Sequence, residues 1–237
     1  NSSDSVCLLK EGDGCFKLNK LGLHNCVHIT AAGVGSCLRN LPRLMYLSYD
    51  KLVESIEMVI TIDGDYLKSN KKFKIRNLDE FSEFYDFEAH PHVINILLRV
   101  CPDLESLRFF TSDEGCHHLY RIPNIRGLQL ETEDLGSGFQ KLLQQYTQLK
   151  TLHLTFRKMS YNQVIQMSQN CPNLEVIRLI GMGIENSQEL NSLVCKDKCL
   201  RNLRILDVRL VSDEHPLRLL HFLLDYSLDI EDVTVST

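Results

Sequence analysis

Apolar residues follow one fixed spacing at several places in this chain. After Cys171 they stand at Leu174, Ile177 and Leu179, with two residues and then one residue between them. The alternation around Ile177 and Leu179 is typical of a short β-strand that has one buried face. The pattern therefore predicts a strand whose aliphatic side chains enter a core and whose intervening side chains face the other way.

The same spacing returns at regular intervals. The first apolar residues of successive copies are Leu104, Ile125, Leu149, Leu174, Leu203 and Ile230. The intervals are 21, 24, 25, 29 and 27 residues, within the roughly 20–29 residues typical of leucine-rich repeats. Units of this length stack side by side, and each adds one parallel strand. We therefore predict an α/β leucine-rich-repeat solenoid, horseshoe-shaped, with a parallel sheet on its concave side and helices and loops on its convex side.

Three further copies extend the pattern toward the start of the chain. Two of them begin with Leu18 and Leu44. A third fits Asn70-x-x-Phe73-x-Ile75 if asparagine replaces the first leucine. With this copy the chain holds about nine repeats.

The interval from this third copy to the next is 34 residues, too long for one ordinary repeat. We expect the excess to form a loop at 79–88, an acidic and aromatic stretch. Because no Pro- or Gly-rich break interrupts the chain, we predict a single leucine-rich-repeat domain over 1–237. In it, 1–16 is a cap or partial repeat and 61–100 is an irregular repeat with the inserted loop.

Apolar residues at helical spacing follow most of the predicted strands. Thr30 and Ser160 stand where helix N-caps are expected, and Ser160 with Gln163 fits a capping box. The 21-residue interval leaves little room for a helix at 111–120, where we expect a compact loop, and Gly181-Met182-Gly183 fits a turn. The expected helices carry Val34, Cys37 and Leu38; Leu52, Val53, Ile56, Val59 and Ile60; Val93, Ile96, Leu97 and Val100; Phe139, Leu142, Leu143 and Tyr146; Val164, Ile165 and Met167; Leu190, Leu193 and Val194; and Leu217, Leu220, Leu223 and Leu224.

One repeat carries a more specific motif. Cys26-x-x-Ile29-Thr30-x-x-Gly33 resembles the C-x-x-I-T-x-x-G signature of the cysteine-containing subclass of leucine-rich repeats. The Cys-Pro-x-Leu openings at Cys101 and Cys171 are similar to repeats of the same family. On these residues the chain resembles the F-box leucine-rich-repeat proteins.

That resemblance implies a function in protein degradation. Proteins of the F-box leucine-rich-repeat type are substrate receptors of cullin-based ubiquitin ligases, and their F-box binds the adaptor. An F-box needs about three helices, which the residues ahead of Leu18 cannot hold. An adaptor and cullin are therefore expected as partners only through an N-terminal F-box missing from this sequence.

Composition and charge narrow the possible partners. The chain has 237 residues, of which 43% are hydrophobic and 24% charged, with a net charge of -5 and no apolar run of membrane-spanning length. Bulk charge therefore indicates neither nucleic-acid nor membrane binding. Nine cysteines without framework spacing, and a single N-x-S/T site at Asn1, favour a reducing compartment, either cytoplasmic or nuclear.

Candidate chemistry is sparse. Cys116-His117-His118 has ligand-type side chains, but adjacent residues in one loop do not supply the four converging ligands that zinc needs. Cys195-x-x-x-Cys199 has no second pair, and His90 and His92 flank a proline at an expected helix start. No nucleophile-elbow, phosphate-loop or zinc-protease motif is present. We predict no catalytic, metal-binding or cofactor-binding residue, and a protein that is not an enzyme.

A binding function is expected on the concave sheet, where the side chains between the core leucines point. Cationic and apolar side chains there suit an acidic or phosphorylated partner segment, because arginine pairs with carboxylate and phosphate through two hydrogen bonds. The alternatives are a regulator of a small GTPase or other enzyme that acts through loops at the strand ends, and a repeat scaffold outside the ubiquitin system. The predicted partner-binding residues are Lys72, Lys74, Arg76, Arg108, Phe110, His153, Arg178, Ile180 and Arg209.

Overall fold

The computed structural model describes residues 15, 17–23, 26, 28–62, 72–79, 91–185, 200–211, 216–225 and 227–236. The chain forms two compact units. Unit 1 comprises 1–85 and 92–104, and unit 2 comprises 86–91 and 105–237. The predicted helix at 190–194 and most of the predicted loop at 79–88 lie outside the described residues.

Unit 1 contains three strands that alternate with helices. The strands pair in parallel and in chain order, and α1 packs against α2. Thr30 caps α1 as predicted, since its hydroxyl accepts a hydrogen bond from the Gly33 backbone N–H at 3.2 Å. The elements are β1 (Lys20–Leu23), α1 (Ala31–Asn40), β2 (Tyr46–Tyr49), α2 (Leu52–Ile62), β3 (Asn77–Asp79) and α4 (Pro91–Val100).

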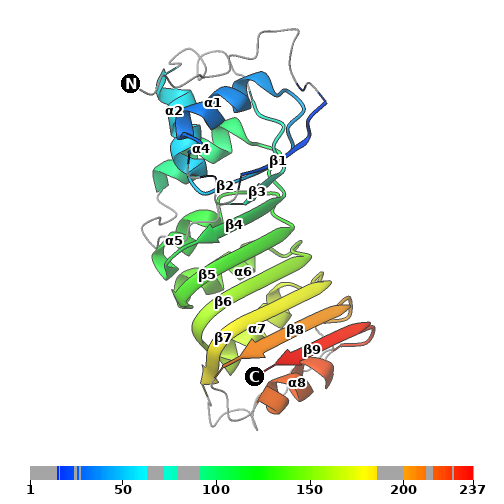
Figure 1. Ribbon diagram of the computed structural model, residues 1–237. Coiled ribbons are helices and arrows are strands. Elements are labelled where there is room, and N and C mark those ends of the chain that lie inside the picture. Colours follow the sequence, from blue (N-terminus) through cyan, green and yellow to red (C-terminus); the bar gives the residue numbers. More distant parts are fainter. Residues whose placement is uncertain are drawn as a thin grey trace. The chain divides into compact units, whose positions relative to one another are not determined.

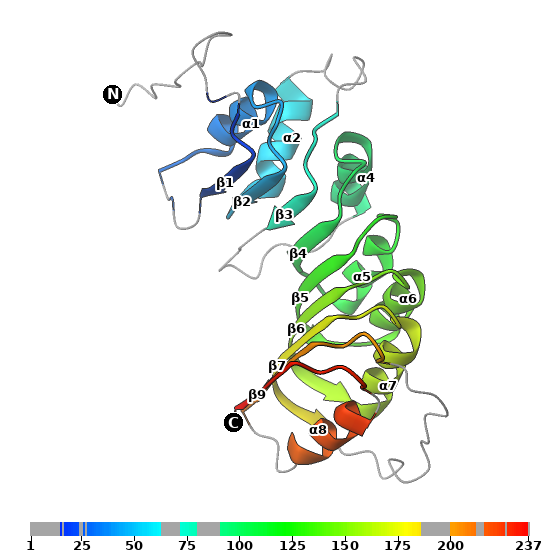
Figure 2. The same cartoon turned by 90° about the vertical axis from the view of Figure 1, so that its right-hand side faces the viewer.

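Unit 2 repeats the same alternation over six parallel strands, again in chain order (Figure 1). Helices α5, α6 and α7 lie together on one face of these strands (Figure 2). The capping box of Ser160 and Gln163 is present at α7. The elements are β4 (Ser106–Phe110), α5 (Asp113–Leu119), β5 (Gly127–Asp134), α6 (Ser137–Gln145), β6 (Thr151–Ser160), α7 (Tyr161–Asn170), β7 (Val176–Glu185), β8 (Ile205–Leu210), α8 (Pro216–Asp225) and β9 (Asp232–Ser236).

The periodic aliphatic residues form the core, as the spacing predicts. Leu152 pairs with Ile177, and Ile177 with Leu206, in three neighbouring strands. All three side chains are fully buried. The predicted fold class, an α/β repeat solenoid with a parallel sheet, is therefore confirmed.

A shared backbone carbonyl fixes the register from repeat to repeat. We number the strand motif from its first apolar residue, so that Leu149 is first and His153 is fifth. The carbonyl of the second residue accepts hydrogen bonds from the second and third backbone N–H groups of the next repeat. Lys150 O, for example, accepts from Glu175 N at 2.8 Å and from Val176 N at 3.0 Å. The same pair of bonds forms at the carbonyls of Asn19, Met45, Glu105, Arg126, Glu175 and Arg204.

This ladder corrects the predicted third strand. Arg76 N and Asn77 N donate to Met45 O at 2.9 and 3.0 Å, and Leu78 pairs with Leu47. Ile75 is therefore the first motif residue and Leu78 the fourth, so the prediction that began at Asn70 was wrong by five residues.

Two shorter predictions also fail. The segment 111–120 holds helix α5 rather than a loop, because Ser112 caps the helix by accepting from Gly115 N at 3.2 Å. Gly181-Met182-Gly183 lies inside strand β7 rather than in a turn. Gly181 faces the core there, and an added Cβ atom would lie 2.4 Å from the ring of Phe156. The glycine thus leaves room for a large neighbour, and the strand continues past it.

A carboxylate from one repeat caps the helix of the next. Asp113, in α5, accepts hydrogen bonds from the backbone N–H groups of Gly136 at 2.8 Å, Gly138 at 3.0 Å and Phe139 at 2.9 Å. These donors lie at the start of α6, where the first N–H groups of a helix have no partner within it. A Cβ atom on Gly138 would lie 2.0 Å from the Asp113 carbonyl oxygen. The two repeats therefore meet at van der Waals distance in this joint.

Candidate protein-binding face of the sheet

The face of unit 2 opposite its helices presents the fifth and seventh residues of each motif. Adjacent strands bring these side chains into two rows, about 4.8 Å from one strand to the next. The register agrees with the predicted order for this unit, although the binding role of these residues stays a prediction. The fifth-residue row is Arg108, Gln129, His153, Arg178, Asp207 and Thr234, and the seventh-residue row is Phe110, Glu131, Thr155, Ile180, Arg209 and Ser236.

Three exposed apolar side chains meet on β7 and at the end of β8. Ile180 is 39% exposed, Met182 50% and Val211 73%. Val211 N donates to Gly181 O at 3.0 Å, which places Val211 beside Met182. Single exposed apolar residues are ordinary, but contiguous ones mark interaction sites more often. We call Ile180, Met182 and Val211 the apolar patch.

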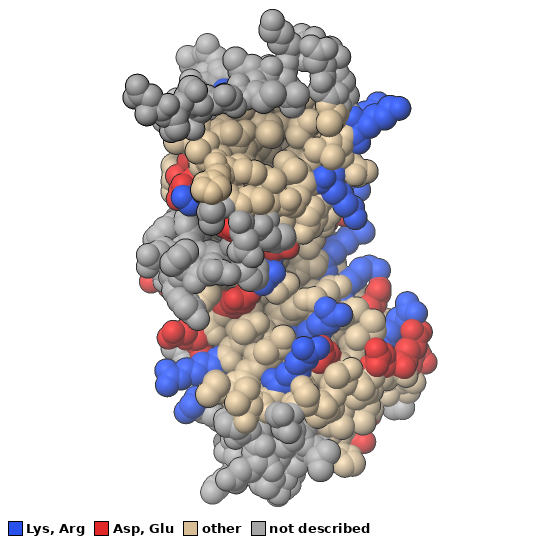
Figure 3. All heavy atoms as spheres, in the orientation of Figure 1, with Lys and Arg blue, Asp and Glu red and all other residues tan. Residues whose placement is uncertain are grey.

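Arginine side chains surround this apolar patch. Arg178 precedes Ile180 by one outward position, Arg209 is its register partner on β8, and Arg157 on β6 lies next to Met182. Figure 3 shows basic side chains across this face of unit 2, with uncharged surface and some acidic side chains between and beside them. An apolar centre with arginine at its edge is the composition that binding hot spots favour.

The charges of these arginines are not equally available. Arg209 donates two hydrogen bonds to Asp207, at 3.0 and 2.9 Å. Both carboxylate oxygens of Asp207 thus accept from Arg209, although Arg178 is the register partner of Asp207 on β7. Arg178 is exposed and forms no ion pair with any residue in the described ranges. It is therefore the cation on this face best placed to receive a carboxylate or phosphate.

His153 lies in the row of fifth residues, between cations. Partial burial lowers its pKa, and so do the positive charges of Arg178 on β7 and Arg108 on β4, whereas Asp207 on β8 raises it. The imidazole is consequently neutral near pH 7. An anion bound beside it would offset the repulsion from the two arginines.

Arg108 and Phe110, at the β4 end of the face, are more enclosed. Arg108 Nη2 lies 2.8 Å from Glu131 Oε1, and both side chains are partly buried. Phe110 pairs with Glu131 across β4 and β5. Both residues therefore lie on the predicted face, but the charge of Arg108 is already balanced.

Three of the predicted site residues do not lie in a strand. Lys72, Lys74 and Arg76 precede β3 instead of lying in it, because the motif begins at Ile75. The fifth motif residue is Asp79, which accepts a hydrogen bond from the Tyr46 hydroxyl at 3.1 Å. The predicted cluster of these cations with Arg108 is therefore not supported by the strand register. Lys72 and Lys74 instead line a pocket within unit 1.

Sequence reasoning missed Arg157, Met182 and Val211. It ended every strand at the seventh motif residue, whereas β6 and β7 each contain ten residues. The signal was the buried position at Phe156, two residues beyond Leu154, which continues the alternation. Glycine at the equivalent position of β7 concealed the same continuation there.

Groups suited to metal or redox chemistry do not converge in the part of the chain that the structure describes. No three His, Cys, Asp or Glu side chains there are placed to hold a metal ion. Cys116 is buried in α5, and burial raises its pKa to about 12. Burial likewise raises the pKa of Cys101 and Cys171 to about 12. These three thiols are core residues at neutral pH rather than nucleophiles. Cys195 and Cys199 lie outside the described residues.

Comparison with known proteins shows a distant relationship to an F-box protein. No protein-family model matches the chain. Over 136 residues, or 57% of its length, the chain is 24% identical to the F-box protein SKIP1 of Arabidopsis thaliana, and it spans 45% of that protein. None of the described helices is long and apolar enough to cross a membrane. The chain is thus an α/β repeat solenoid with distant similarity to an F-box protein.

Proposed function

We propose that this chain is a protein-interaction module that recognises substrates for a cullin-type ubiquitin ligase. The observation that carries the proposal is the apolar patch of β7 and β8 with Arg178 at its edge. The similarity to an F-box protein supports the link to ubiquitin ligases. The proposed role is that of a non-enzymatic receptor, which acts in the cytoplasm or nucleus.

The partner segment is proposed to combine an apolar residue with a carboxylate or phosphate. The apolar residue covers Ile180 and Met182, and burial of one such side chain contributes about 1.5–3 kcal/mol. The anionic group pairs with Arg178, whose guanidinium forms no ion pair among the described residues. The adaptor and cullin would contact an F-box elsewhere in the complete protein, and not this face.

The test is affinity purification of the complete native gene product from its own cells, followed by mass spectrometry. We expect an F-box adaptor and a cullin with the wild type and with Arg178→Glu, and at least one further partner that only the wild type retains. The matched control is Lys141→Glu, which makes the same charge change at an exposed position of α6. This variant should retain every partner.

Two outcomes would contradict the proposal. Recovery of a small GTPase without adaptor or cullin would favour the enzyme-regulator alternative. An unchanged partner set with Arg178→Glu would show that the strand face is not the recognition surface.

A further inference from the structure

A separate surface feature lies in unit 1. A pocket of about 380 Å³ opens between the end of α1 and the segment that leads into β3. Its walls are the apolar side chains of Leu38, Leu41, Pro42, Leu44, Phe73 and Ile75, together with Arg39, Lys72 and Lys74. The volume falls within the roughly 300–1,000 Å³ of typical ligand sites.

The pocket arises from a local departure from the repeat. In the regular repeats, the residue three places before the first motif leucine is buried, the next two are outside, and a tight turn closes the segment. Cys171 to Leu174 is an example, with the Leu174 N–H bonded to Cys171 O at 3.2 Å. Leu41, Cys101, Ile122, Tyr146 and Leu200 occupy the same buried position in other repeats.

Lys72 stands at that position in the third repeat and is exposed. Residues 72–75 are extended instead of turned, so that exposed and buried side chains alternate, and Phe73 enters the core in place of Lys72. The Phe73 N–H bonds to Val100 O at the end of α4, at 2.7 Å. The pocket lies beside this segment, where an exposed lysine takes the position that an apolar side chain occupies in the other repeats.

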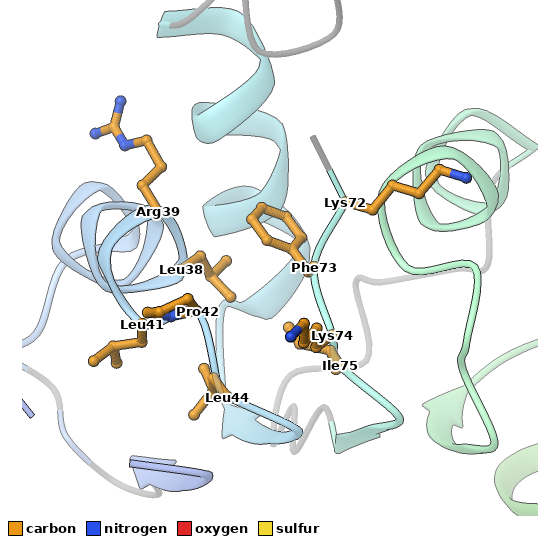
Figure 4. Close-up of a pocket in the computed structure, with 9 residues that line it drawn as sticks. All are labelled: Leu38, Arg39, Leu41, Pro42, Leu44, Lys72, Phe73, Lys74 and Ile75. Atoms are coloured by element: carbon orange, nitrogen blue, oxygen red, sulfur yellow. The ribbon is translucent and has the colours of Figure 1, made fainter. Parts of the chain in front are cut away.

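The residues that line the pocket are either apolar or positively charged. Figure 4 shows Leu38 and Phe73 pointing toward each other across the pocket, while Arg39 and Lys72 extend outward on opposite sides. No Asp or Glu belongs to the described lining. An apolar hollow of this kind forgoes packing contacts, and the positive charges of Lys72 and Lys74 beside it repel each other. Both costs are relieved by a ligand with an apolar group and negative charge.

We propose that this pocket binds an acidic segment of a partner protein, whose single apolar side chain enters between Leu38 and Phe73. The flanking carboxylates of the segment pair with Lys72 and Lys74 at the rim. An apolar centre inside a charged rim is the usual anatomy of a protein interface. The inference does not depend on the strand face of unit 2, and it gives the chain two separate points of contact with partners.

The test uses the full chain and a fluorescein-labelled acidic peptide with one central leucine flanked by glutamates, followed by fluorescence anisotropy. We expect saturable binding. Replacing the peptide leucine by serine should weaken it by roughly 10-fold or more, from the lost apolar burial. The double variant K72E/K74E should also bind about 10-fold more weakly or worse, because its rim is reversed in charge.

A matched control separates the site from general electrostatics. K20E/K141E makes the same change in net charge at exposed positions away from the pocket, and should bind the peptide as the wild type does. R178E should also bind it unchanged, which keeps this result independent of the strand-face proposal. Circular dichroism checks that each variant is folded.

The proposal is overturned if the serine peptide binds as tightly as the leucine peptide, or if K20E/K141E weakens binding as much as K72E/K74E. It is also overturned if octanoate binds in the pocket and the peptide does not, since the occupant would then be a small amphiphilic anion.

Discussion

The two units place their cations differently although both are built from the same repeat. In unit 2, regular repeats carry Arg108, His153 and Arg178 into one row on the strand face. In unit 1, the corresponding residues are Gly22, Ser48 and Asp79, and the basic residues Lys72 and Lys74 lie before the strand. A shift of a few residues within one repeat therefore decides whether basic side chains lie on the strand face or line a pocket before the strand.

The physical cause of this difference is the closing turn. In a regular repeat, the turn before the strand sets where the ladder of backbone hydrogen bonds begins. In the third repeat the turn is replaced by extended chain, and the backbone N–H of Phe73 bonds to α4 instead. The ladder still begins at the carbonyl of Met45, so the strand keeps its register while the residues before it change their exposure.

The largest expected effect concerns the tight joint of unit 2. Gly138→Ala should lower the free energy of unfolding by about 3 kcal/mol, since the added Cβ would lie 2.0 Å from a backbone oxygen. Gly33→Ala in α1 is the matched change in unit 1, where the nearest atom would be the Thr30 hydroxyl at 3.4 Å. It should leave stability unchanged or raise it by up to about 1 kcal/mol. Urea denaturation measures both, and equal losses would remove the contrast between the joints.

A medium effect tests the corrected strand of unit 1. Leu78→Ala should cost about 2 kcal/mol, because Leu78 is 2% exposed and packs as the fourth motif residue. Lys74→Ala should change the free energy of unfolding by less than about 0.5 kcal/mol, because Lys74 is exposed. Thermal denaturation distinguishes them. If Leu78→Ala is as mild as Lys74→Ala, the motif begins at Asn70 after all.

The smallest expected effect concerns the lowered pKa of His153 in unit 2. The pKa of His153 is lower in the folded chain than its ordinary value of 6.5, so the unfolded chain takes up this proton first as the pH falls. Stability is therefore lost as the pH drops through 6.5 toward the folded pKa. His153→Gln should reduce the fall in the urea midpoint between pH 7 and pH 5. An identical pH profile for both proteins would mean that burial and the two arginines do not lower the pKa of His153.

The same linkage predicts how binding depends on pH. An anion bound beside Arg178 raises the pKa of His153, so binding takes up protons and strengthens as the pH falls from 7 toward 6. A partner bound by the wild type should show this trend in isothermal titration, and His153→Gln should show less of it. An affinity that weakens over this range in the wild type alone would place the anion elsewhere.

Much of the fold could be predicted because its signal is carried by buried residues. Leu152, Ile177 and Leu206 had to be aliphatic to pack in neighbouring strands, and that requirement is visible as spacing. Helix caps such as Thr30 and Ser160 could be predicted equally well, since their hydroxyls accept hydrogen bonds from the first N–H groups of the helix. Ser112 caps α5 in the same way, although the 21-residue interval alone predicts a loop there.

The misplaced features share another cause. At the third repeat, burial of Phe73 and Ile75 imitates a strand, because extended chain alternates its side chains whether or not it joins a sheet. Only the ladder from Met45 separates the two cases, and it is made of backbone atoms that all residues possess. The apolar patch on β7 was missed for a similar reason. Gly181 occupies a buried position but has no apolar side chain, so the hydrophobic pattern does not indicate that the strand continues.

The shared carbonyls at the second motif residue suggest a practical use of this molecule. Because main-chain atoms hold neighbouring strands in step, the outward side chains of unit 2 are free to be exchanged without moving the scaffold beneath them. A library that varies Thr155, Arg178, Ile180 and Arg209 would therefore sample new surface chemistry on an unchanged frame. Such a library would turn this stack of repeats into a source of engineered binders.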